Sequence, residues 1–96
     1  MDCYEYIMDR IDAELNDAEG YIDHAHKHRQ DRRPLADMLY QLSVQEFNHA
    51  SILKDHISKM VSSNEHDGWR MIWDWYQKRV AAREMVIRTK IDSYKP

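Results

Sequence analysis

Helix-breaking residues are scarce in this sequence, which has two glycines and two prolines among its 96 residues. Long helices would therefore meet few interruptions. The single cysteine, Cys3, excludes a disulfide within the chain and suits a reducing compartment. No apolar run approaches membrane-spanning length, and the first residues lack the apolar core of a secretion signal. We therefore expect a cytoplasmic protein without membrane contact.

A strong charge imbalance is also lacking, since the formal net charge is −3 at pH 7. The basic run Lys27 to Arg33 is short and contains Asp31, which favours a solvated loop over a nucleic-acid surface. Hydrophobic residues make up 43% and charged residues 32%, which is typical of a protein rich in amphipathic helix. Because a chain this short builds a small core, self-association would help to complete it.

The apolar periodicity predicts one all-helical domain with three long helices, over about residues 2–29, 34–61 and 69–92. Pro34 suits the start of the second helix. On the first helix we expect a buried stripe of Tyr4, Met8, Ile11, Leu15, Ala18, Ile22 and Ala25. On the second we expect Leu35, Leu39, Leu42, Glu46, His49, Leu53, His56 and Met60. On the third we expect Trp73, Tyr76, Val80, Glu84, Ile87, Ile91 and Tyr94.

Four ionisable residues on these apolar faces are the candidate functional residues. Antiparallel helices joined by a tight turn near residues 31–32 would place Glu14 level with His49 and within a turn of Glu46. The same geometry around the second loop would place Glu84 beside Glu46. The sequence therefore predicts that these side chains meet at one height.

A shared metal ion would explain such a meeting. Burying a lone carboxylate costs several kcal/mol or more unless it is paired, protonated or bound to a metal. Glu46 and His49, three residues apart on a helix, project from the same side and could ligate one ion together. The oxygen-rich set of Glu14, Glu46, His49 and Glu84 favours iron or manganese, without choosing between them.

The pattern resembles the half-length form of the ferritin-like superfamily, which includes rubrerythrin-like proteins and short encapsulated-type ferritins. A Glu on one helix and Glu-x-x-His on the next are matched by Glu14 and by EFNH, Glu46 to His49. The resemblance covers roughly residues 2–61. It implies a homodimer or higher homo-oligomer in which two helical hairpins form a four-helix bundle around a di-iron site.

By the same resemblance, the site would oxidise ferrous iron with oxygen or peroxide. Glu46 would bridge the irons, Glu14 would be a terminal ligand and His49 would supply imidazole. The chain departs from the family pattern because no second Glu-x-x-His follows, Glu84 being followed three residues later by Ile87. Either a second copy supplies the remaining ligands, or Glu84 completes a smaller site within one chain.

Two other interpretations remain open. The acids and His49 could form a metal-free polar network that fixes helix register in an interaction module, or the site could buffer a divalent metal without turnover. His56 is more simply a core histidine than a ligand. His24 and His28, four residues apart, suit the C-terminal end of the first helix better than a surface metal.

Overall fold

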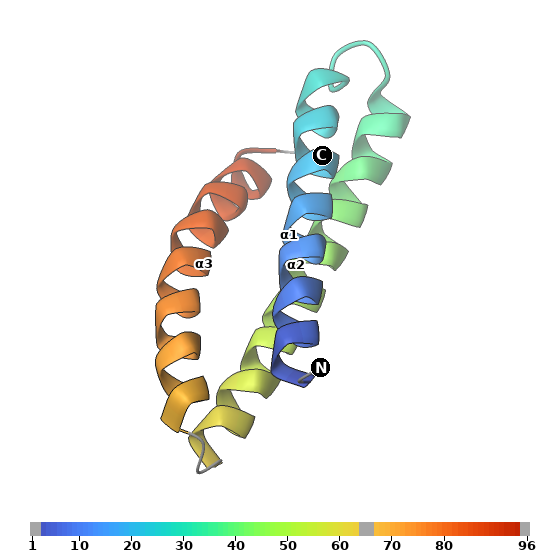
Figure 1. The fold of residues 1–96 in the computed structure, drawn as a ribbon. Helices are drawn as coiled ribbons and strands as arrows, with labels where there is room; N and C mark the ends of the chain where they lie inside the picture. Colours follow the sequence, from blue (N-terminus) through green and yellow to red (C-terminus); the bar gives the residue numbers. More distant parts are fainter. Residues whose placement is uncertain (1–2, 64–66, 95–96) are drawn as a thin grey trace.

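The computed structural model describes residues 3–63 and 67–94, and its regular elements are three α-helices. Helix α1 spans Cys3–Lys27, α2 spans Arg33–Ser63 and α3 spans Asp67–Ser93. The first two form an antiparallel hairpin, and α3 runs back along one side of it (Figure 1). The molecule is elongated, with extents of 53 × 21 × 17 Å. The described part of the chain is thus all-helical, as its periodicity predicts.

A tight turn joins α1 to α2. Backbone N–H groups of His28 and Arg32 donate to the carbonyls of His24 and His28, at 3.0 and 2.9 Å. Pro34 lies in the first turn of α2, where its missing N–H costs no helical hydrogen bond. This turn sets the register of the two long helices, because little slack remains between them.

The core between α1 and α2 is built from the expected stripe of α1. Ile11, Leu15, Ala18 and Ile22 are fully buried there. From α2 small side chains face them, and Ser43 Oγ donates a buried hydrogen bond of 2.7 Å to the carbonyl oxygen of Ala18. Small residues let the two helices approach closely, so the hairpin is the tighter part of the fold.

The stripe that we expected to be buried on α2 is wrong by one position. The buried residues are instead Ala36, Ser43, Phe47, Ala50, Ile57 and Val61. Their spacing of three, four and seven residues marks a neighbouring helical face. The expected stripe lies at its edge, and His49, His56 and Met60 are exposed. This shift leaves the face with Glu46 and His49 open in the single chain.

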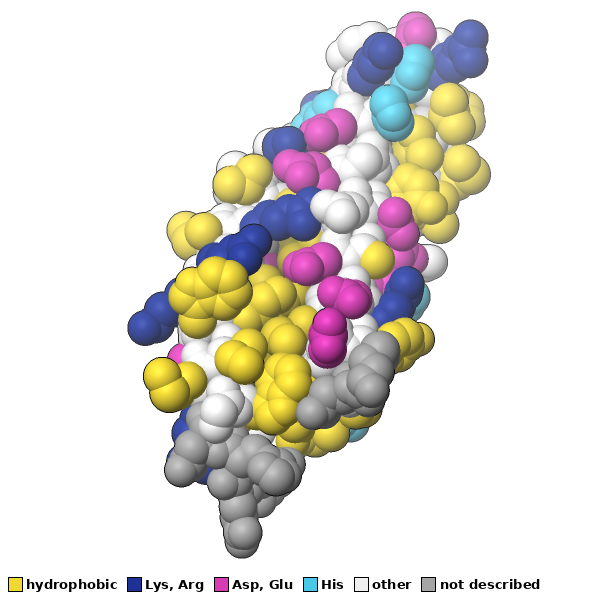
Figure 2. All heavy atoms as spheres, viewed as in Figure 1, with side chains coloured by type: hydrophobic (Ala, Val, Ile, Leu, Met, Phe, Trp, Pro, Cys, Tyr) yellow, Lys and Arg dark blue, Asp and Glu magenta, His cyan; other side chains and the backbone are white. Residues whose placement is uncertain are grey.

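Helix α3 covers the side of the hairpin that faces away from Glu46 and His49. It does so through the apolar stripe that its sequence predicts. Trp73, Tyr76, Val80 and Ile87 are buried against the other helices. Polar contacts also hold α3 against the hairpin. Tyr76 Oη, for example, donates a hydrogen bond of 2.9 Å to the carbonyl oxygen of Met8. Figure 2 shows acidic side chains on the α1 surface beside basic side chains of α3. Lys90 Nζ, for example, lies 2.9 Å from Asp23 and 3.1 Å from Glu19.

Candidate metal centre

Glu14, Glu46 and His49 lie together on the α1–α2 hairpin. One potential ligand atom from each lies within 4.8 Å of the others, and among the described residues no other set of three or more His, Cys, Asp or Glu side chains converges in this way. Glu14 Oε2 is 3.3 Å from His49 Nδ1, and Glu46 Oε1 is 3.7 Å from the same nitrogen. The predicted level of Glu14 with His49 is therefore confirmed.

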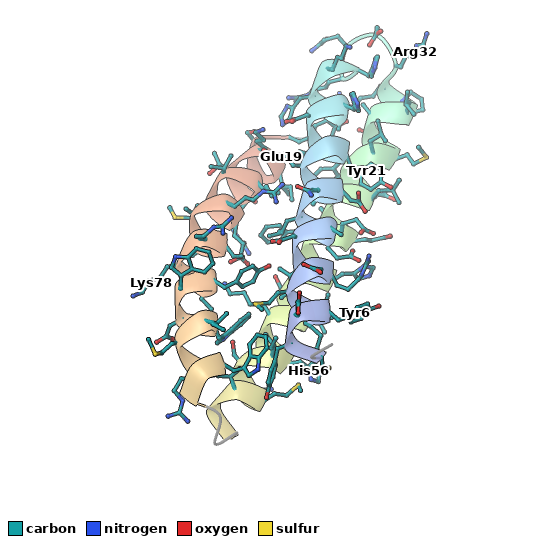
Figure 3. The ribbon with its side chains drawn as sticks, viewed as in Figure 1. Tyr6, Glu19, Tyr21, Arg32, His56 and Lys78 are labelled. Carbon is teal, nitrogen blue, oxygen red and sulfur yellow. The ribbon has the colours of Figure 1, made fainter. Side chains whose placement is uncertain are left out.

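Exposure increases across the three side chains. The side chain of Glu14 is 9% exposed, that of Glu46 21% and that of His49 56%. The group therefore has a buried carboxylate at its base and an imidazole at its rim. It opens on the side away from α3, where Tyr6 and Tyr21 extend from α1 while Glu19 points toward α3 (Figure 3).

A shallow cavity of about 350 Å³ adjoins the group. Its lining combines the polar ends of Arg10, Glu14 and His49 with the apolar side chains of Ile52 and Leu53. Tyr6, which is 55% exposed, forms another wall. Ile52, which is 57% exposed, adds uncovered apolar surface beside the site.

The two carboxyl groups perturb each other. A hydrogen bond with Glu14 and burial raise the pKa of Glu46 above its usual value. The pKa of Glu14 is lowered, chiefly by its hydrogen bond with Glu46 and then by those with His49 and Arg10. This pattern is expected when two carboxyl groups share one proton, because like charges resist ionising together. A cation between them would relieve the same repulsion.

Arg10 already contacts this group. Its Nη2 atom donates a short hydrogen bond to Glu14 Oε1, four residues along α1. The two Glu14 oxygens thus have different partners, with Arg10 on one and His49 on the other. The guanidinium side chain is 44% exposed, so it reaches the carboxylate from the solvent side. The spacing of four was visible in the sequence, but a charged neighbour on a helix surface is common enough to carry little signal alone.

The structure does not bring Glu84 into the group, so its place beside Glu46 is a wrong expectation. Its Oε1 accepts a hydrogen bond of 2.5 Å from Lys54 Nζ, on the face of α2 that meets α3. Near the level of Glu46, α3 instead presents Arg88, whose guanidinium lies 5.1 Å from the centre of the Phe47 ring. The hairpin estimate was wrong in two ways, because it misplaced α3 by about one turn along α2 and did not fix which side of α2 faces α3.

The other histidines of residues 3–63 lie outside the donor group. His56 is exposed, whereas we expected a core position. His24 is also exposed, and the nearest acidic partner of His28 is Asp31, with Nδ1 and Oδ1 3.4 Å apart. His24 lies in the last turn of α1 and His28 directly follows the helix, where protonated imidazole would complement the helix dipole.

The donor types fit an iron or manganese ion, but one chain supplies too few donors to complete its coordination. Two carboxylates and one imidazole are suitable ligands for these metals, which commonly take more than three. Comparison of the chain with protein-family models, with curated proteins and with solved structures gives no match. None of the described helices has a stretch long and apolar enough to cross a bilayer.

Proposed function

We propose that the protein binds ferrous iron through Glu14, Glu46 and His49 and oxidises it with oxygen or peroxide at an interface between two copies of the chain. The observation that carries the proposal is the convergence of the three donors within 4.8 Å on the face that α3 leaves open. In a 96-residue protein, an incomplete donor set beside uncovered apolar surface is best explained by a second chain.

A symmetric pairing of two hairpins would complete both the core and the site. In a two-fold dimer the same patch contacts itself, so each donor would be supplied twice. Two copies would offer four carboxylates and two imidazoles, the set found in di-iron four-helix bundles. The exposed side chains of Tyr6 and Ile52 would be buried around the site. Helix α3 would then lie outside each hairpin and leave the pairing face free.

Each donor has a distinct part in this proposal. Glu46 would bridge two ions, and the nearly buried Glu14 would be a terminal ligand. The half-exposed His49 would provide a neutral nitrogen donor at the rim. Iron would supply the electrons for reducing oxygen or peroxide, while the protein holds the ligands and limits access by water.

Substitution of Glu46 tests the proposal. Glu46→Gln keeps the size of the side chain but weakens its binding to metal, so iron bound per chain and oxygen consumption after addition of ferrous iron should both fall to background. Glu19→Gln is a matched control, because Glu19 is a part-buried acid that contacts Lys90 on the other side of α1. Equal and negligible iron in wild type and Glu46→Gln would overturn the proposal.

The oligomeric state is an independent requirement. Light scattering of the wild type should give a mass of at least twice 11.6 kDa. Ile52→Glu would place a charge on the proposed pairing face and should reduce both the mass and the iron bound, because half of the ligands would be lost. A monomer that still binds two irons would contradict the shared site.

The contact between Arg10 and Glu14 favours a second candidate function. In that case Arg10, Glu14, Glu46 and His49 form a metal-free polar network at the pairing face of a helical interaction module. Such a module would dimerise equally well after treatment with a chelator and would show no iron-dependent oxygen consumption. A passive metal buffer would instead take up iron without catalysing its oxidation.

A further inference from the structure

In the described part of the chain, Arg10 is the arginine that contacts the Glu14 carboxylate, whose other partner is the His49 ring. It lies one helical turn before Glu14 and lines the same cavity as His49 and Ile52. Its target is nearly buried, at 9% exposure, whereas its own side chain is 44% exposed. A partly exposed positive charge therefore lies on the solvent side of a nearly buried carboxylate.

We propose that Arg10 is a resident counter-cation, which occupies Glu14 in the metal-free protein and is displaced when a divalent cation binds. The inference rests on the proposed metal site and adds a regulatory residue to it. Arg10 would keep the buried carboxylate paired while the site is empty, and would lower its affinity for metal by competing for the same carboxylate.

Electrostatics make the two cations mutually exclusive. A guanidinium is always protonated near neutral pH, so it keeps its positive charge. A metal bound to Glu14 and His49 would lie within a few ångströms of that charge and would be repelled by it. Because the Arg10 side chain is already half in solvent, it can leave without unfolding part of the helix.

A role in helix stability alone explains the contact less well. Pairs with the base four residues before the acid are the weaker order on an isolated helix. Exposed pairs of this type contribute little to stability in general. Arg33 and Asp37 form a second pair with the same order, 2.9 Å apart and away from the metal centre. This pair supplies a matched control for the effect of losing an arginine.

The experiment compares Mn²⁺ binding to the full chain by calorimetry in wild type, Arg10→Met, Arg10→Lys and Arg33→Met. Loss of the competitor should tighten Mn²⁺ binding by about fivefold in Arg10→Met, which corresponds to the upper end of what one partly exposed charge contact contributes. Arg10→Lys and Arg33→Met should bind within about twofold of wild type. Arg10→Gln replaces Arg10→Met if the latter does not fold.

Thermal unfolding gives a second readout. Arg10→Met should lower the melting temperature without metal, as loss of any ion pair could, but it should also increase the shift that saturating Mn²⁺ produces, which a purely structural role would not do. Equal or weaker Mn²⁺ binding in Arg10→Met, with binding still abolished by Glu46→Gln, would overturn the role of Arg10 and leave the metal site intact. Absence of Mn²⁺ binding in wild type and Arg10→Met alike would overturn both.

Discussion

The pair formed by Lys54 and Glu84 provides a direct test of which acid belongs to the metal centre. Lys54 Nζ and Glu84 Oε1 are 2.5 Å apart, and the side chains are 25% and 17% exposed. Glu84 thus has its own partner, Lys54, at the α2–α3 interface. Replacing Glu84 should lower stability and leave metal binding unchanged.

The expected magnitude follows from the burial of the pair. A hydrogen bond to a charged group contributes about 1.5–3 kcal/mol. Removing one partner also leaves the other charge partly desolvated. We therefore expect Lys54→Met and Glu84→Leu each to lower the free energy of unfolding by about 2 kcal/mol. The double variant should lose less than the sum, with a coupling of about 1–2 kcal/mol.

The assay is urea unfolding of wild type, both single variants and the double variant at one fixed protein concentration, because dimerisation would make stability depend on concentration. Mn²⁺ binding is measured on the same four proteins. Glu84→Leu should bind Mn²⁺ as wild type does. A coupling near zero, or loss of metal binding in Glu84→Leu, would refute the separation of Glu84 from the site.

Three further predictions concern the rest of the fold. Ser43→Ala should lower the free energy of unfolding by about 1 kcal/mol in urea denaturation, because its buried hydrogen bond to Ala18 is lost. Gly20→Ala should raise the melting temperature, since the added methyl group would meet no atom within 4 Å apart from the neighbouring backbone of its own helix, and alanine favours the helix by about 1 kcal/mol. The hydroxyl of Tyr94, 2.6 Å from the carboxylate, lowers the pKa of Asp37. The stability that ionised Asp37 gains from this contact is therefore fully present above the unfolded pKa of an aspartate, about 3.9. It is lost as the pH falls through the lower pKa of Asp37 in the folded protein. Urea unfolding should show Tyr94→Phe less stable than wild type at pH 7, with the difference shrinking below about pH 4; a constant difference would contradict this.

Local pattern and turn length were enough for the hairpin and for part of the site. The stripe of α1 around Ile11, Leu15 and Ala18 is buried as its spacing predicts. The tight turn leaves little freedom in register, so simple counting placed Glu14 level with His49. These predictions succeed because helix periodicity and a short connection act over a few residues.

The buried face of α2 could not be read in the same way. Its apolar residues cover a wide arc, with Leu39 and Leu53 on one stripe and Phe47 and Ile57 on the next. Periodicity gives no reason to prefer either, because both repeat every three or four residues. Packing against α1 and α3 decides which of the two stripes is buried. The stripe that contains His49 is left at the open edge of the helix.

The sequence by itself determined three long helices, a close α1–α2 hairpin and the meeting of two acids with an imidazole. Only the tertiary structure decided that Glu84 pairs with Lys54 instead of joining the two acids and the imidazole, and that Arg10 contacts Glu14 from the solvent side. The physical reason is that a helix repeats its chemistry on every face. Which face is covered depends on the partners that distant parts of the chain bring to it.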